Sequence, residues 1–507
     1  MFVQSITGHI CLAILAFLQT YRESAIYNAF LRVSYSFGKA FRESTLHRVF
    51  TSNPSRERLC ETSVIFSAVS SALNALIACL SRGYAFLRDR VRGGVLNAIY
   101  NAAAKSGRLC YENVLAFFFV VMFVFPHNSW NNLYAVVGAA AFAVWYVILI
   151  LSGRSFAHNF KKFDAALLIF AFAVIFAVVG AIDVSDALRI ALFILSAVVL
   201  SLSVAGSIST VQALRKFVAV ICAALCVTAL FALYQNAVGV EVSLEYTDVY
   251  TNSDMPGRVY STFANPNNYA ELLVLIIPFI YALIITAQRK GERLFWVAAL
   301  ALCVFALTLT FSRSCYVALA IATVAFLAMF DWRLLLPFLL VCVAAVPFLP
   351  PAVTNRILTI GSMSDTSNYY RLYVWEGVLR MLGDNAVTGI GLGPASFAKI
   401  YPRYAHIYAT TAPHSHMLYL ELFLETGAVG ALSFFCYIFG ALKKGLGLFN
   451  STDKTLRPFI IAAIASLCGI AFVCAAEYIW FYPRVMFAFW LVVGLLSASC
   501  RIGRQAR

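Results

Sequence analysis

Two histidines near residue 415 have a clear capacity for chemistry. His414 and His416 stand in the segment TAPHSHMLYLELFLETGAVG, and with His406 they make three of the 7 histidines of the chain. Histidine titrates near neutrality and is the usual general base for taking a proton from a hydroxyl. A His-x-His pair can also bind a metal ion, but no cysteine and no set of carboxylates accompanies this pair. We therefore expect acid–base chemistry and no metal.

A carboxylate follows the histidines at Glu425, which falls about two turns into an apolar segment. An ionisable side chain inside a membrane segment is either functional or paired with another polar group. The sequence therefore predicts a supporting role for Glu425 in the same site.

Three arginines stand beside apolar segments, and the ligand that suits them is an anion. Arg258 lies in PGRVYSTFANPNNYAELL, Arg313 in TLTFSRSCYVALA and Arg371 in NYYRLYVWEGVLRML. A guanidinium at the membrane boundary is costly unless it is paired or bound to an anion. Snorkelling to the lipid headgroups is the alternative for Arg313, and an ordinary interfacial helix is the alternative for Arg371.

The sequence FANPNN predicts the start of a helix close to Arg258. Asn265 is a favoured capping residue, and the proline after it is tolerated at the first helical position. The first turn, which includes Asn267, presents backbone N–H groups that could hold a phosphate. A helix cap without any ligand is the alternative interpretation.

These residues must be positioned by a membrane-embedded scaffold. Of the 507 residues, 62% are hydrophobic and 12% are charged, with a mean hydropathy of +0.83, whereas soluble domains carry roughly 25% charged residues. The composition predicts an all-α polytopic membrane protein with about twelve transmembrane helices. We place them near 112–127, 132–152, 163–182, 187–205, 215–236, 267–287, 294–311, 314–330, 333–350, 415–440, 457–478 and 483–500.

The distribution of charge predicts the orientation. Every second connection is basic, as with Arg154, Lys161 and Lys162, whereas the others are acidic or mixed, as with Asp183 and Asp186. Cytoplasmic connections of membrane proteins collect Lys and Arg, so the net charge of +15 needs no nucleic acid to explain it. We expect a multi-pass protein of the bacterial inner membrane with both termini in the cytoplasm.

The remaining segments define the expected domains. Residues 1–110 are basic, with apolar residues at helix-like spacing, and predict a cytoplasmic or membrane-surface amphipathic region. Residues 112–500 form the transmembrane domain, and its long extracytoplasmic loop between spans nine and ten covers 351–414. That loop contains helical patterns at 370–382 and 395–402. Its GIGLG sequence at 389–393 lacks the context of a nucleotide-binding loop and predicts a turn.

Four segments resemble motifs of the O-antigen ligase and O-antigen polymerase (Wzy-type) membrane proteins. They are STFANPNNYAELL, FSRSCYVALA, NYYRLYVWEGVLRMLGDNAVTGIGLGPASF and HSHMLYLELFLETGAVG, in the order of that family and spread over about 112–500. Two departures stand out, since Met417 replaces the asparagine that usually follows the second histidine, and Ser261 with Thr262 replaces the usual Gly-Thr.

The resemblance implies a GT-C-like membrane glycosyltransferase without cofactor or metal. It implies a glycan donor linked to undecaprenyl diphosphate, an acceptor that is a glycan or an anchor molecule, and membrane lipids as surroundings. Arg258, Arg313 and Arg371 would bind the diphosphate, and His416, which aligns with the histidine of the family, would be the base, with His414 as the other candidate. Tyrosines and tryptophan of the long loop would stack on sugar rings.

Other functions stay open from the sequence alone. A ligase and a polymerase share the donor and differ only in the acceptor. A transporter or flippase of lipid-linked glycans would also have many spans, but it predicts an internal repeat and polar groups near the membrane midplane, and neither is evident. A non-enzymatic scaffold protein could use the basic region 1–110 to hold a partner. That function does not explain the arginines and histidines expected on the outer side.

Overall fold

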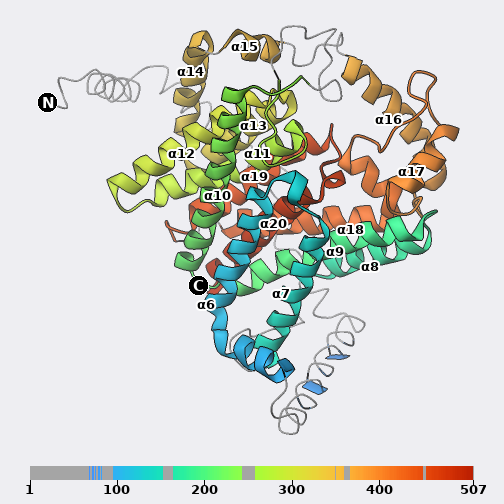
Figure 1. Cartoon of the computed structure of the whole chain (residues 1–507), viewed down its shortest axis with the longest axis horizontal. Coiled ribbons are helices and arrows are strands. Elements are labelled where there is room, and N and C mark those ends of the chain that lie inside the picture. Colours follow the sequence, from blue (N-terminus) through green and yellow to red (C-terminus); the bar gives the residue numbers. More distant parts are fainter. Residues whose placement is uncertain are drawn as a thin grey trace, which may run out of the picture. The chain divides into compact units, whose positions relative to one another are not determined.

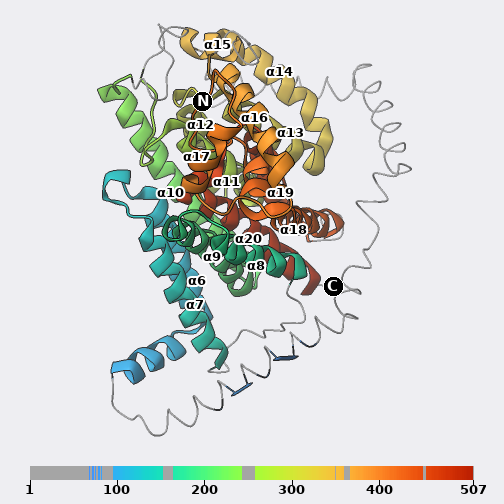
Figure 2. The ribbon, with the colours of Figure 1, turned by 90° about the vertical axis from the view of Figure 1, so that its right-hand side faces the viewer.

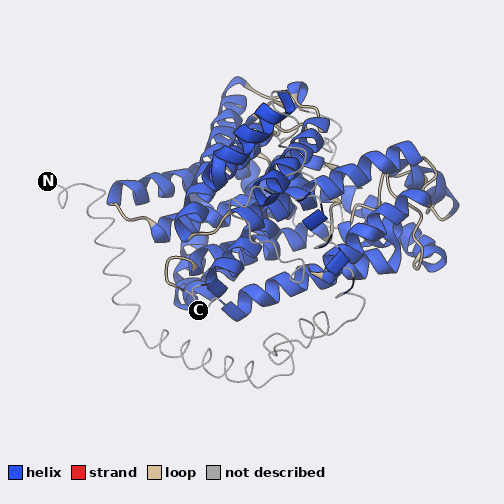
Figure 3. Ribbon diagram, turned by 90° about the horizontal axis from the view of Figure 1, so that it is seen from below, coloured by secondary structure: helices blue, strands red, loops and turns tan. Residues whose placement is uncertain are grey.

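The computed structural model describes residues 95–151, 164–242, 257–348, 350–358, 366–448 and 453–505, with a few single positions between 68 and 82. The chain divides into Met1–Leu59 and Cys60–Arg507, and all the described residues belong to the second unit. These residues form helices and connections without any strand (Figure 3). Most of the predicted amphipathic region 1–110, and the basic residues Arg154, Lys161 and Lys162, lie outside the described part.

Apolar helices, two of which are short, make up most of the described part. They are α6 (Val95–Val124), α7 (Leu133–Leu151), α8 (Ala165–Val179), α9 (Val184–Ser207), α10 (Val211–Val238), α11 (Pro266–Thr286), α12 (Lys290–Leu309), α13 (Arg313–Asp331), α14 (Leu335–Ala345), α18 (Leu418–Leu448), α19 (Arg457–Cys474) and α20 (Pro483–Gln505). Within the described residues, nine segments are long and apolar enough to cross a membrane. An all-helical polytopic membrane protein is thereby confirmed.

Three helices are shorter in their apolar part than the spans expected from the sequence. Helix α8 has 15 residues, and the apolar part of α6 is limited to Leu109–Val124. Helix α14, on the segment expected to be the ninth span, has only 11 residues and follows α13 through the short turn Trp332–Leu334. The count of about twelve spans therefore stays a prediction.

The centre of the bundle consists of α11, α19 and α20 (Figures 1 and 2). Their apolar windows are 83%, 78% and 89% buried, more than those of the outer helices. Helix α11 has buried residues on all of its faces. A helix that is apolar all round must be covered by other helices on every side. Helices α10, α12, α13, α19 and α20 pack against α11. The end of α11 that bears Asn265 is therefore held rigidly in the interior.

The long connection before α18 is a folded helical module. It contains α15 (Pro351–Leu358), α16 (Thr366–Asn385), α17 (Pro394–Ile400) and the turn Tyr401–Arg403. Buried apolar residues of α16 and α17 form a small core that also includes Leu424 of α18. The helical patterns predicted at 370–382 and 395–402 thus coincide with α16 and α17.

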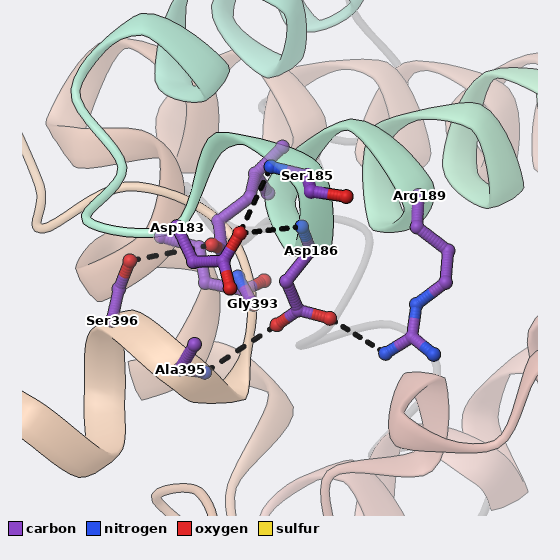
Figure 4. Close-up of polar contacts among 9 residues, drawn as sticks. Asp183, Ser185, Asp186, Arg189, Gly393, Ala395 and Ser396 are labelled. Atoms are coloured by element: carbon purple, nitrogen blue, oxygen red, sulfur yellow. Dashed lines mark hydrogen bonds and ion pairs between the residues drawn. The ribbon is translucent and has the colours of Figure 1, made fainter.

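The module is fastened to the turn between α8 and α9 (Figure 4). The N–H of Ile182 donates to Ser396 Oγ at 3.2 Å, and the N–H of Ala395 donates to Asp186 Oδ2 at 3.4 Å. Asp186 also pairs with Arg189 at 2.6 Å. Gly393 has a φ of +94°, and a Cβ atom there would lie 2.7 Å from Asp186 Oδ2. The last glycine of GIGLG therefore allows the Asp186 side chain to approach the backbone closely.

Candidate active site

Arg258 is tied to the first turn of α11. Asn265 caps that helix by accepting the N–H of Asn267 at 2.8 Å, with Pro266 at the first helical position. The Asn267 side chain accepts Arg258 Nη2 at 2.5 Å, and Arg258 Nε donates to the carbonyl of Thr310 at 2.8 Å. Arg258 is only 6% exposed. Burial, together with the charge of Arg356, lowers the pKa of Arg258 to about 10, so the guanidinium stays charged at neutral pH.

The tight turn between α12 and α13 brings further arginines to the same place. Arg313 is the first residue of α13, directly after the turn, and is half-buried. Arg356 of α15 donates from Nε to the carbonyl of Phe311 at 3.2 Å. Arg258 and Arg356 thus bind consecutive carbonyls of one turn and repel each other electrostatically. Such a concentration of positive charge suits a multiply charged anion.

Arg371 enters the site from α16 and is paired with Glu477. Arg371 Nη2 lies 2.5 Å from Glu477 Oε1, in the connection between α19 and α20. The same carboxylate acts electrostatically on Arg258, so the two arginines share an acidic neighbour. The carbonyl of Glu477 also accepts the N–H of Leu418 at the start of α18. Glu477 therefore connects the arginines to the segment that carries the histidines.

The two histidines lie with their rings 4.3 Å apart. His414 Nδ1 accepts the backbone N–H of His416 at 3.1 Å, and its ring packs on Phe481 at 4.7 Å. His416 has a φ of +54°, which is uncommon for a residue with a Cβ atom. Its ring nitrogens are buried and have no hydrogen-bond partner among the described residues. They are therefore available to a bound molecule.

Burial and positive charge keep both histidines neutral. Burial is the main cause that lowers the pKa of His414 to about 4, with the charge of Arg371 adding to it. Burial, the neighbouring His414 and Arg371 lower the pKa of His416 to about 2. A neutral imidazole can accept a proton, whereas an imidazolium cannot.

Trp375 and the first turns of α18 hold the histidine segment in place. Trp375 Nε1 donates to the carbonyl of Ser415 at 2.9 Å, and Glu421 Oε2 accepts the N–H of Ser415 at 2.7 Å.

Glu425 accepts the N–H of Gly393 at 3.1 Å and the hydroxyl of Tyr478 at 2.9 Å. Both oxygens of Glu425 are thus bonded to the protein, which gives this residue a positioning task.

The structure brings the residues predicted from the sequence to one end of the bundle and adds others. Arg371 acts on both histidines and shares Glu477 with Arg258. The sequence reasoning missed Arg356 and Glu477. Each is a charged residue that follows an apolar segment, which is a signal that the sequence carries, but neither lies in a motif. Within the described residues, no group of three or more His, Cys, Asp or Glu could hold a metal ion.

Comparison with known proteins supports the resemblance found in the motifs. The family model for O-antigen ligase matches residues 298–435, which contain Arg313, Arg371, both histidines of the site and Glu425. Arg258 and the cap of α11 lie before the matched segment. No curated protein matches the chain. The match over residues 298–435 supports the resemblance of the chain to the O-antigen ligase and polymerase family, and with it a general role in polysaccharide assembly at the membrane.

Proposed function

We propose that the chain is a glycosyltransferase that moves a glycan from an undecaprenyl diphosphate carrier to a hydroxyl group on the extracytoplasmic side. The observation that carries the proposal is the position of Arg371, which shares Glu477 with Arg258 and acts electrostatically on both His414 and His416. Groups suited to a diphosphate and groups suited to a hydroxyl thus lie side by side.

The arginines would stabilise the leaving diphosphate. Charge accumulates on the diphosphate as its bond to the sugar breaks, and fixed positive groups lower the energy of that state. Arg258, Arg313 and Arg371 come from three different elements, and Arg356 adds a fourth guanidinium at the same turn. The capped first turn of α11 adds its helix dipole.

His416 would act as the base. The acceptor oxygen forms a bond to the anomeric carbon, the bond from that carbon to the diphosphate oxygen breaks, and the hydroxyl proton passes to an imidazole nitrogen. Undecaprenyl diphosphate leaves with the bonding electrons. His416 suits this role because both of its nitrogens lack partners among the described residues, whereas His414 Nδ1 accepts the N–H of His416. His414 is then a positioning residue.

Donor binding would also adjust the base. Burial, His414 and Arg371, in that order, depress the pKa of His416 to about 2, which makes it a weak base. A diphosphate that pairs with Arg371 would offset that positive charge and raise the pKa of the imidazole. The histidine would therefore be a stronger base with the donor in place than without it.

The proposal is tested with purified protein, an undecaprenyl diphosphate-linked oligosaccharide from the same cell, and EDTA. We expect release of undecaprenyl diphosphate, and we expect His416→Ala and Arg313→Ala to abolish it. Arg333→Ala, at the other end of α13, is the matched control and should retain activity.

The products also separate the alternatives. A ladder of longer lipid-linked chains would identify a polymerase, and a conjugate that forms only with an added acceptor would identify a ligase. Loss of activity on addition of EDTA would contradict metal independence. Movement of intact donor across proteoliposomes without release would contradict the enzyme and favour a flippase.

A further inference from the structure

Helix α16 presents three different faces. Arg371 pairs with Glu477, and Trp375 donates to the carbonyl of Ser415. Both side chains therefore face the candidate active site. Val374 and Val378 are fully buried in the small core of the module. The positions that remain at helical spacing are Tyr369, Tyr373, Glu376 and Arg380, which lie on one stripe of the helix. Of that third stripe only Tyr373 packs against the small core, and the other three side chains belong neither to that core nor to the candidate active site.

The third stripe continues into a row of aromatic rings, which we call the aromatic row: Tyr369, Tyr373, His406 and Tyr408. The rings of Tyr369 and Tyr373 are 6.3 Å apart at 22°, and those of Tyr373 and His406 are 4.3 Å apart at 9°. Tyr408 follows His406 at 5.3 Å. The two outer members, Tyr369 and Tyr408, are 44% and 70% exposed.

The row is held in a fixed arrangement by polar contacts. His406 Nδ1 accepts the backbone N–H of Tyr408 at 3.2 Å, and His406 Nε2 lies 3.8 Å from Glu376 Oε2. Glu376 in turn pairs with Arg380. Because the stacking and these contacts fix the inner rings, the outer rings are presented to the surroundings with little freedom. Rigid exposed aromatic groups of this kind mark binding surfaces more often than they serve the fold.

We propose that the aromatic row binds a glycan chain, an inference that rests on the proposed function for the identity of its ligand. Sugar rings have flat faces of C–H groups that pack on aromatic rings, and their hydroxyls require donors and acceptors nearby. Tyr369 and Tyr408 offer the aromatic surfaces. Glu376 and Arg380, about half exposed, offer the polar groups.

The position of the row determines which part of the glycan it binds. The row lies on a different side of α16 from Arg371 and Trp375, as the helical spacing of these residues requires. It is therefore not in contact with the bond that reacts. It binds sugars remote from that bond, so it acts on the affinity for a long chain and on the length of the products.

The test uses the full chain in phosphatidylcholine nanodiscs. The probe is the polysaccharide released by mild acid from the envelope of the same cell, which carries no lipid and no diphosphate. Binding is measured by saturation-transfer NMR. We expect the double variant Tyr369→Leu with Tyr408→Leu to bind about ten-fold more weakly. The matched double variant with Phe at both positions should bind within about two-fold of the natural protein.

The outcomes separate this inference from the proposed function. The aromatic row is not a glycan site if the Leu double variant binds the polysaccharide as well as the natural protein does, or if the natural protein does not bind it. A loss of quenching by brominated lipid in the Leu double variant, relative to the natural protein, would also overturn this inference, since the tyrosines would then lie at the membrane interface. Release of undecaprenyl diphosphate is measured separately. If undecaprenyl diphosphate is released but glycan binding does not depend on the two tyrosines, only the glycan site at the aromatic row is refuted. If glycan binding depends on the tyrosines but no undecaprenyl diphosphate is released, only the transferase function is refuted.

Discussion

Arg371 and Glu477 form an ion pair of 2.5 Å between the helical module and the connection of α19 to α20. Their side chains are only 19% and 17% exposed. A pair that is largely removed from water costs desolvation energy, and such pairs are weak evidence for stability alone. From the position of the pair, beside Arg258 and both histidines, we propose that Glu477 and an anionic ligand compete for Arg371.

Replacement of Glu477 by Gln should therefore strengthen donor binding. Without the carboxylate, the diphosphate no longer competes for Arg371, and we expect the KM for the donor to fall about three- to ten-fold. The measurement is the initial rate against donor concentration. Glu292→Gln, which removes the partner of Arg215 in the first turn of α12, is the control and should leave KM unchanged. A higher KM for the Glu477 variant would show that the pair is only structural.

Arg356 should contribute to donor binding although no motif contains it. Gln at this position can still donate a hydrogen bond to the carbonyl of Phe311, so Arg356→Gln removes mainly the charge. We expect kcat/KM for the donor to fall about ten- to hundred-fold, in the range of one lost charge-assisted contact. Arg333→Gln, at the other end of α13, serves as the control. An unchanged kcat/KM in the Arg356 variant would exclude it from the site.

The depressed pKa of His416 predicts a stability that decreases in acid. Between about pH 6.5 and the folded pKa of about 2, the unfolded chain binds a proton at this residue that the folded chain does not bind. The free energy of unfolding should therefore fall as the pH is lowered from 7 to 5. His416→Gln should lose less stability over this interval, as measured by Tm in detergent at the two pH values. A parallel loss in both proteins would refute the low pKa.

Glu425 should matter for the fold of the site more than for the reaction itself. Glu425→Ala leaves the N–H of Gly393 and the hydroxyl of Tyr478 without their acceptor, and each buried unsatisfied group costs about 1–3 kcal/mol. We expect a lower Tm together with lower activity. Tyr478→Phe removes only one of the two contacts and should have a smaller effect on both quantities. Loss of activity at an unchanged Tm would indicate a direct role in the reaction.

The sequence predicts the fold better than the site because the two depend on different physical information. Apolar run length determines where helices such as α11, α19 and α20 form, and their observed bounds lie close to the predicted ones. Helices α8 and α14 are shorter than the spans expected at 163–182 and 333–350, because apolar run length does not determine where a helix ends. The proximity of Arg371 to Glu477, 106 residues apart, results from tertiary packing. The positive φ of His416 likewise leaves no trace in residue type.

Comparison of donor binding and turnover in His416→Ala tests the central claim most directly. Both quantities are measured on the same purified protein, with His414→Ala alongside. We predict that the Kd for the lipid-linked donor changes by less than about three-fold while kcat falls about 10²- to 10⁴-fold, because a general base acts in the reaction and not in binding. Turnover close to that of the natural protein, or a complete loss of donor binding, would contradict the role of His416 as the base.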